Sequence, residues 1–275
     1  MLCGRNGNRE PDGAGWALTV VDQRYLVVNA DDFGMSPGVS RGILAAHEGG
    51  IVTSSSLMVR PTAAGEAVVM SRDYPALSLG LHVDLCEWVF EEGEWKLSYE
   101  VVPLHDEAAV DDEVNRQLDR FRGLVGREPT HFDSHQHFHL QHRVRERLME
   151  LAREIGVPLR HCTPGLTYVG SFYGQTAEGE PNPDAITVGA LIGVLNTLPG
   201  GIVELACHPG DAREVNTRYR NERIVEQRVL CDAAIGAAIE RESISLCSFT
   251  DVRQLLTREP SQVSPQHEQE QPSRG

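Results

Sequence analysis

The chain has 275 residues and a mass of 30.3 kDa, and 40% of its residues are hydrophobic, so it can build a sizeable core. Its formal net charge of −15, from 40 acidic and 25 basic residues, argues against the basic face that a nucleic-acid partner requires. The six cysteines show no CxxC spacing and several lie in apolar runs, which is typical of free thiols in a reducing compartment rather than of a disulfide framework.

The two ends of the chain differ in composition from the part between them. Residues 1–22 are polar and rich in Gly and Asn, and we expect a flexible N-terminal extension without the apolar core of a signal peptide. Residues 258–275 carry almost no apolar side chains, and we expect a disordered polar tail. Residues 23–257 are expected to form the folded domain. No apolar run reaches the length of a membrane span, so we expect a soluble cytoplasmic protein.

Short apolar runs alternate with stretches of helical periodicity along the domain. The predicted strands are residues 25–30, 52–59, 77–85, 130–134, 157–161, 202–207 and 243–249. The predicted helices are residues 37–48, 61–71, 108–124, 144–155, 185–198, 221–241 and 251–256. A loop or small hairpin is expected at residues 86–104, and a long loop rich in Gly and Pro at residues 164–183.

The alternation predicts parallel strands in an α/β architecture. Polar residues at or just after the predicted strand ends help to choose between an open sheet and a barrel: Asp31, Asp32, His82, His135 and His208. The carboxyl ends of barrel strands meet on one face, whereas an open sheet could leave the first and sixth strands too far apart for these residues to converge. We therefore predict a distorted (β/α) barrel of about seven parallel strands.

The stretch YLVVNADDFGMSPG, residues 25–38, is the centre of this arrangement. A mostly apolar run leads into the adjacent carboxylates of Asp31 and Asp32, and Ser36 and Pro37 then suit the N-cap and the first position of a helix. Two neighbouring carboxylates are costly unless a cation or a proton is shared between them. The pair is therefore a candidate for chemistry.

A metal site is the first candidate. Asp32, His82 and His135 would come from three strand ends, and two imidazoles with one carboxylate leave coordination positions open, as in catalytic sites. A metal ion there would lower the pKa of a bound water and polarise a carbonyl. Asp31 would be free to take a proton from that water, and His208 could protonate a leaving group. The set predicts metal-assisted hydrolysis of an acyl bond.

Several other polar residues lie close to this set. His137 and His139, in the HQHFH run, are either orienting or substrate-contacting residues. Asp133 and Glu204 have the strand parity of inward-facing residues, where a carboxylate either orients a histidine or forms a structural ion pair. The remaining histidines considered are expected to be surface or core residues: His47, His105 and His161.

The blocks VVNADDFGMSPGVSRGI, GIVTSSSLMV, LGLHVDL, PTHFDSHQHFHL and ELACHPG resemble the YdjC-like carbohydrate deacetylases, over about residues 24–256. The resemblance implies a distorted (β/α) barrel related to the polysaccharide deacetylases, and removal of acetyl groups from N-acetylated sugars with a divalent metal. By motif, it implies metal ligands at Asp32, His82 and His135. It likewise implies that Asp31 is the catalytic base and His208 the proton donor.

The resemblance leaves the substrate and the metal open. Zn²⁺ or Mg²⁺ suits the ligands, with Mn²⁺ and Co²⁺ as alternatives. Two other functions remain in view: a non-haem iron oxygenase, which also uses two histidines and a carboxylate, and a non-catalytic sugar-binding protein. A homodimer is one candidate assembly. Aromatic residues of the strand-end loops would either stack on sugar faces or pack on the barrel rim: Trp88, Phe90, Trp95, Phe172 and Tyr173.

Overall fold

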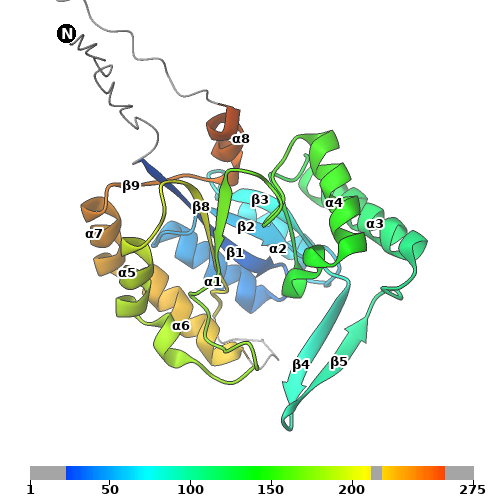
Figure 1. The fold of residues 1–275 in the computed structure, drawn as a ribbon, viewed down its shortest axis with the longest axis horizontal. Coiled ribbons are helices and arrows are strands. Elements are labelled where there is room, and N and C mark those ends of the chain that lie inside the picture. Colours follow the sequence, from blue (N-terminus) through cyan, green and yellow to red (C-terminus); the bar gives the residue numbers. More distant parts are fainter. Residues whose placement is uncertain (1–22, 212–218, 258–275) are drawn as a thin grey trace, which may run out of the picture.

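A curled parallel β-sheet runs through the centre of the protein (Figure 1). The computed structural model describes residues 23–211 and 219–257, so the predicted extension at 1–22 and the predicted tail at 258–275 lie outside the described residues. The strands of the sheet are β1 (Arg24–Phe33), β2 (Ser54–Leu57), β3 (Ser78–Val83), β6 (Phe132–Ser134), β7 (Leu166–Val169), β8 (Gly201–Cys207) and β9 (Ile244–Leu246). They lie in the order β6-β3-β2-β1-β8-β7, and β9 also pairs with β1.

β1 is the central strand. It pairs with β8 over residues 24–30 and with β2 over residues 29–33. β9 pairs with residues 24–26 of β1. Because β8 already occupies one edge of β1 there, β9 lies on the same edge as β2, at the N-terminal end of the strand. Beyond β6 the sheet is extended by a single parallel bridge from Phe132 to Leu159, and no ladder joins β6 to β7 in the described ranges. The sheet is thus a partial barrel, which confirms the predicted distorted barrel of about seven parallel strands.

Helices pack around this sheet (Figure 1). The α-helices are α1 (Pro37–Glu48), α2 (Ala64–Ser71), α3 (Glu107–Val125), α4 (His142–Ile155), α5 (Val188–Asn196), α6 (Arg220–Leu230), α7 (Ala233–Arg241) and α8 (Phe249–Thr257). Two short 3₁₀-helices are η1 (His135–Leu140) and η2 (Pro183–Ile186). The antiparallel hairpin of β4 (Cys86–Glu91) and β5 (Glu94–Glu100) projects from the body. None of the helices in residues 23–211 and 219–257 has the length and apolarity to cross a membrane.

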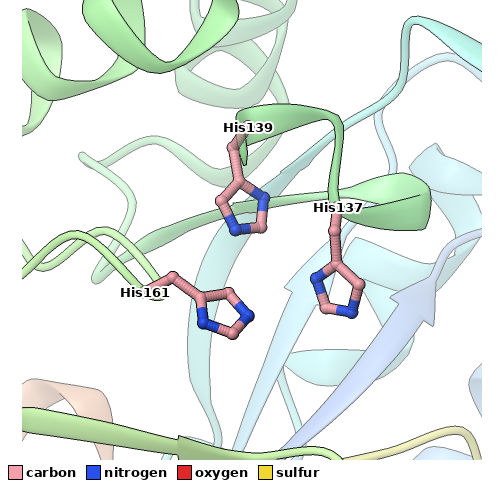
Figure 2. A group of neighbouring side chains, drawn as sticks. All are labelled: His137, His139 and His161. Atoms are coloured by element: carbon pink, nitrogen blue, oxygen red, sulfur yellow. The ribbon is translucent and has the colours of Figure 1, made fainter. Parts of the chain in front are cut away.

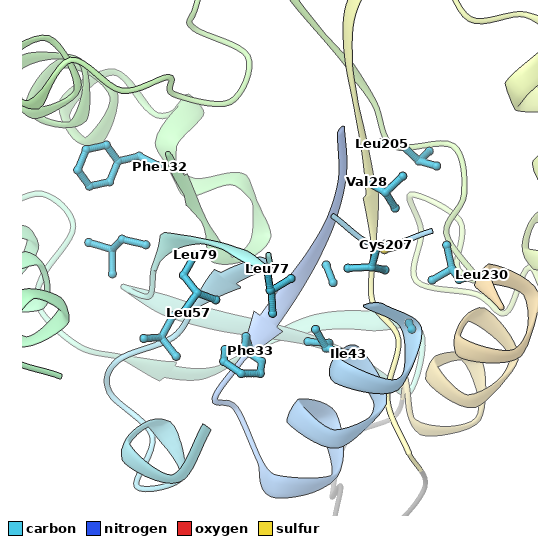
Figure 3. Close-up of a cluster of buried hydrophobic side chains, with 14 of the residues drawn as sticks. Val28, Phe33, Ile43, Leu57, Leu77, Leu79, Phe132, Leu205, Cys207 and Leu230 are labelled. Carbon is cyan, nitrogen blue, oxygen red and sulfur yellow. The ribbon is translucent and has the colours of Figure 1, made fainter. Parts of the chain in front are cut away.

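The two faces of β1 have different neighbours. Because side chains alternate along a strand, Val28 faces the main hydrophobic core while Asn29 and Asp31 face the interior of the curled sheet. Figure 3 shows part of this core, to which Val28 of β1, Ile43 of α1 and Leu230 of α6 all belong. The apolar face thus fixes β1 against the helices, and the polar face carries the candidate site.

α1 begins as the sequence predicts. The Ser36 hydroxyl accepts a hydrogen bond from the Val39 backbone N–H at 3.2 Å, and Pro37 occupies the first turn. This cap satisfies one of the backbone donors that a helix start leaves unpaired. The cap follows Asp32 closely in the chain, so the start of α1 fixes the loop that carries both carboxylates.

The predicted strand at residues 157–161 is wrong. Its pairing is limited to the bridge at Leu159, because Pro158 has no N–H to donate and can only accept, from Phe132 N–H at 2.9 Å. The chain instead forms β7 within residues 164–183, which the sequence predicts as a loop. Arg160 N–H donates to the Phe132 carbonyl at 3.0 Å, and this bond places Arg160 beside the end of β6.

The predicted helix at residues 221–241 is two helices. α6 ends at Leu230 and α7 begins at Ala233. Asp232 has an extended backbone, and its carboxylate accepts a hydrogen bond from the Ala234 N–H at 2.8 Å, so it caps α7. Helical periodicity on both sides of Asp232 hides this break in the sequence.

α1 also supports the turn that follows β8. Asp211 N–H donates to the Gly38 carbonyl at 3.0 Å. A Cβ built on Gly42 would lie 2.2 Å from the Cα of Gly210, so the backbones of α1 and of the turn approach as closely as glycine allows. This contact sets the position of His208, which lies in the same turn.

Candidate active site

The two carboxylates at the end of β1 are buried and have different partners. Asp32 has a backbone φ of 70°, in the left-handed region that non-glycine residues seldom adopt. Asp31 contacts a buried arginine, whereas Asp32 faces two imidazoles. Strained backbone of this kind persists where surrounding contacts hold it, and it is enriched at functional sites. The local fold thus separates two adjacent acids into two environments.

Asp32, His82 and His135 form the group that the sequence predicts as a metal site. Asp32 Oδ1 lies 3.3 Å from His82 Nε2 and 3.3 Å from His135 Nδ1. Asp32 Oδ1 and His82 Nε2 are buried and have no hydrogen-bond partner. Ligands of one tetrahedral ion, each at ~2.1 Å from it, are roughly 3.4 Å apart. The three donor atoms therefore fit a divalent cation, which would pair the two orphaned atoms.

Asp133 orients one of these ligands. His82 Nδ1 lies 2.8 Å from Asp133 Oδ1, so the ring donates there and directs Nε2 towards Asp32. Burial alone would lower the pKa of His82, but the Asp133 charge holds it well above the ordinary value. Burial would also lower the pKa of His135, yet contacts with Asp32 and Glu87 raise it to about 9. Both rings thus sit in a field that favours a cation.

Arg160 holds the other acid. Its guanidinium is fully buried and donates two hydrogen bonds of 2.7 Å to Asp31, and it lies 2.9 Å from Asp133 and 2.7 Å from Glu204. Burial alone would raise the pKa of Asp31, but the Arg160 charge, the Arg160 hydrogen bonds and the His82 charge together lower it. Asp31 is therefore ionised at neutral pH. Asp133 and Glu204 both face inward, as predicted.

Arg160 is a site residue that sequence reasoning missed. Two carboxylates predicted to face inward, Asp133 and Glu204, were the available signal, because buried acids need a cationic partner. The inward Glu204 forms an ion pair rather than orienting a histidine, and burial raises its pKa to about 7 despite Arg160.

His208 lies across the pocket from the imidazole pair. Its Nε2 is 3.8 Å from Asp31 Oδ2, and its backbone N–H donates to the buried Glu226 carboxylate. Burial lowers the pKa of His208 to about 4, so the ring is neutral at pH 7. Arg223, also missed from the sequence, donates to Asp32 Oδ2 at 2.5 Å. Each acid thus has an arginine, Arg160 at Asp31 and Arg223 at Asp32, and Asp31 also has the neutral ring of His208 beside it.

A cavity of about 1230 Å³ opens over these residues. The β4–β5 hairpin forms part of its wall, with Trp88 40% and Trp95 45% exposed. Phe172 is fully buried, so it packs under the wall and is not available for stacking on a ligand. Tyr173 stacks on Tyr219 with ring centres 4.7 Å apart. The segment 168–181 supplies further lining residues, so the long connection predicted at 164–183 shapes the pocket.

A second group of imidazoles lies beside this site. His137, His139 and His161 offer nitrogen atoms that all lie within 4.8 Å of one another (Figure 2). The sequence places His137 and His139 near the site and predicts His161 as a surface or core residue. The structure brings the three together, because the bridge from Phe132 to Leu159 aligns the two segments.

The family model of the YdjC-like protein matches residues 25–241. The chain belongs to the YdjC-like protein family. Two curated relatives align with this YdjC-like protein over nearly their whole length. One is a chitooligosaccharide deacetylase of Serratia marcescens, 32% identical over 260 residues, and the other is a carbohydrate deacetylase of Geobacillus stearothermophilus, 31% identical over 253 residues. Each alignment spans 84% of this chain, and 100% and 99% of the relative.

Solved structures share the fold of this YdjC-like protein. A crystal structure from Enterococcus faecalis V583 has a TM-score of 0.67 at 24% identity and covers 84% of this chain and 99% of its own. A family 4 carbohydrate esterase from Streptomyces lividans, solved with acetate, has a TM-score of 0.50 at 13% identity, with 83% and 92% covered. These likenesses show the curled parallel sheet as a shared architecture.

Proposed function

We propose that this YdjC-like protein removes the acetyl group from an N-acetylated sugar or oligosaccharide by metal-assisted hydrolysis. One observation carries the proposal. Asp32, His82 and His135 form a group that can bind a cation, and the ionised Asp31, which does not belong to that group, lies beside it. The relatives named as chitooligosaccharide and carbohydrate deacetylases support the substrate class. The cavity above the group is large enough for a sugar ligand.

Asp32, His82 and His135 would hold the ion. A bound Zn²⁺ or Mg²⁺ supplies Lewis-acid polarisation of the acetyl carbonyl and a water of lowered pKa. His82 keeps its ligand nitrogen in place through its bond to Asp133. Arg223 holds the second oxygen of Asp32, which leaves Oδ1 as the free donor.

Asp31 takes the proton of the attacking water. Arg160 donates a hydrogen bond to each oxygen of Asp31, so the carboxylate is oriented and stays ionised before the reaction. The other carboxylates around Arg160 balance its charge, which leaves Asp31 able to accept a proton. Arg160 is a positioning residue in this scheme, because it acts on the reaction through Asp31.

His208 delivers a proton to the departing amine nitrogen. An amide anion is too basic to leave, so the C–N bond breaks only as that nitrogen is protonated. His208 is neutral before the reaction and therefore has to gain a proton during it. Asp31, 3.8 Å away, is the source that the geometry offers: the proton taken from water passes through Asp31 and His208 to the amine. The products are acetate and the free amino sugar.

The test is acetate release from N-acetylglucosamine and its oligomers, measured with native protein, with chelator-treated protein, and after return of Zn²⁺ or Mg²⁺. We expect turnover to disappear with the metal and to return with it. Full turnover in metal-free protein would overturn the proposal. Sugar binding without acetate release would identify a binding protein, and oxygen-dependent turnover an oxygenase.

We also propose a cytoplasmic location, supported by the cysteines. The five that lie in the described residues are all free thiols: Cys86, Cys162, Cys207, Cys231 and Cys247. Free thiols are typical of reducing compartments.

A further inference from the structure

The group of His137, His139 and His161 is separate from the site described above and shares no residue with Asp32, His82 and His135. His137 and His139 come from η1, and His161 follows Arg160. The ring centre of His137 lies 5.6 Å from that of His139 and 5.4 Å from that of His161. Figure 2 shows the three rings arranged around one common space.

Hydrogen bonds orient two of these rings so that one nitrogen of each is left over. His139 Nδ1 lies 2.7 Å from the Ser134 hydroxyl, and its Nε2 is buried without a hydrogen-bond partner. His137 Nε2 lies 3.4 Å from the Tyr168 hydroxyl, and its Nδ1 is likewise buried without a partner. A buried polar atom without a partner is unfavourable, and a metal-binding histidine characteristically has its other nitrogen held in this way.

The backbone around the cluster is strained. Gln136, His137 and His161 have φ values of 48°, 57° and 62°, all in the left-handed region. Residues in that region cost free energy and cluster at sites where side chains have to be aimed. Here the strained positions include two of the three imidazoles, so the strain coincides with the convergence of the rings.

We propose that His137, His139 and His161 form a second metal site, which takes Zn²⁺ or a similar late first-row divalent cation. Imidazole nitrogen is a ligand for these ions, whereas Mg²⁺ and Ca²⁺ select oxygen ligands, and this group contains no carboxylate. Three histidines leave one position of a tetrahedral ion open for water. His161 is exposed, so it is the ring with room to rotate on to an entering ion.

Arg160 is the neighbouring charge that opposes a cation at the cluster, and buried carboxylates offset it. Arg160 lies near the cluster, with its guanidinium 5.2 Å from the ring centre of Tyr168. That charge is already engaged by the carboxylates of Asp31, Asp133 and Glu204. The cluster therefore faces a buried ion network in which acids outnumber the arginine.

The second site is joined to the first through η1. His135 belongs to the first group, and His137 and His139 to the second, so both use the same short helix. A cation on the second group would fix η1 and with it the ring of His135. His137 also lines the main cavity, which places the second ion at the cavity wall.

The experiment counts bound zinc. Metal-free protein is titrated with Zn²⁺ by calorimetry, and bound metal is measured after dialysis, for the native chain, His161→Gln, Asp32→Asn and the double variant. We expect two equivalents for the native chain, one for each single variant and none for the double variant. His105→Gln, which changes an exposed histidine outside both groups, is the control and should keep two.

Two further measurements make the result decisive. Co²⁺ bound to Asp32→Asn should give the visible absorption of a nitrogen-ligated tetrahedral ion, and His161→Gln in that background should lose it. A crystal soaked in Zn²⁺ should show anomalous density between the three rings. One equivalent in the native chain, or two equivalents in His161→Gln, would overturn the proposal. Neither outcome depends on deacetylation, because the readout is bound metal and not turnover.

Discussion

The strand-end cluster, made of Asp31, Asp32, His82, His135 and Arg160, and the β4–β5 hairpin face the same cavity but are built in opposite ways. The cluster is buried, and every charge in it is tied to another. The hairpin exposes large apolar side chains to the cavity and to solvent. A fixed floor suits chemistry, which requires reacting groups to be held in place, and an adaptable wall suits the selection of a substrate.

The attachment of the two regions to the body differs as well. The floor is continuous with β1, β3 and β6, so it has the rigidity of the sheet. The hairpin is tied down by a few side-chain bonds: the Gln136 amide exchanges two hydrogen bonds with the Trp88 backbone, and Tyr99 donates to Asp84 at 2.8 Å. Substitutions in the floor should therefore change turnover or folding, and substitutions in the hairpin should change substrate binding.

The largest effects should come from the neighbouring acids of the floor. Asp31→Asn removes the proposed base and should lower kcat by ~10²–10⁴-fold while metal binding persists. Asp32→Asn should weaken metal binding itself, because it removes the negative charge that faces both imidazoles. Calorimetric titration of metal and acetate-release kinetics, run on both variants, measure the two effects.

Folding has to be checked in the same pair of variants. Removing one partner of a buried ion pair can cost several kcal/mol, so thermal midpoints should be recorded alongside the kinetics. Arg160 keeps two carboxylates in Asp31→Asn, and we expect this variant to stay folded. Equal loss of metal in both folded variants would show that the two acids do not have separate roles.

The next largest effect concerns His208. His208→Ala should slow hydrolysis of an N-acetyl sugar by ~10²–10⁴-fold, because the amine then leaves without its proton donor. An aryl acetate has a leaving group that departs unprotonated, so the same variant should lose much less rate on that ester, if the native enzyme turns it over. Equal losses on amide and ester would assign His208 to binding, and loss of the metal would make it a ligand.

A smaller effect is expected from the hairpin. Trp88→Ala and Trp95→Ala should raise KM for an oligosaccharide roughly five- to tenfold, with kcat nearly unchanged, as expected for ~1 kcal/mol of lost stacking. Leu246→Ala, an exposed apolar residue of β9 outside the cavity, is the matched control. A fall in kcat with KM unchanged would mean that the hairpin takes part in the chemistry, and the contrast with the floor would break down.

The smallest effect is expected in how the thermal midpoint depends on pH, compared between the buried Glu226 and the exposed hairpin. Burial raises the pKa of Glu226 to about 7, so its contribution to stability is complete below the unfolded value near 4.5 and is lost as pH rises through 7. Glu226→Gln carries no charge to bury, and its thermal midpoint should fall less than that of the native chain between pH 5 and about 8.5. Glu94→Gln, on the exposed hairpin, should follow the native curve.

Local patterns in the sequence suffice for much of this molecule. The polar cap at Ser36 predicts the start of α1, and the apolar run before Asp31 predicts β1, although this strand continues past residue 30 to Phe33. Alternation of elements predicts one polar face for His82 and His208. These features depend on neighbours in the chain, so periodicity and capping rules reach them. The roles assigned to the site residues stay predictions.

The features that sequence reasoning missed depend on partners far along the chain. Arg160 binds Asp31, 129 positions away, and Arg223 binds Asp32, 191 positions away. The short run before Arg160 has strand-like composition, yet Pro158 limits its pairing to one bridge. Local propensity carries no information on such distant contacts. The break at Asp232 is local instead: Cys231 caps the end of α6, and Asp232 caps α7 through the Ala234 N–H within a continuous periodic pattern.

The contact between Gly42 and Gly210 links position 42 on α1 to the placement of the proposed proton donor His208. Any side chain at 42 would push the turn after β8 outward and carry the imidazole of His208 with it. A laboratory screen for altered substrate preference would therefore recover changes on the outer helix that touch neither sugar nor metal. Such a substitution at position 42 would require a second, compensating substitution in the turn after β8, because the added side chain needs room that the turn now occupies.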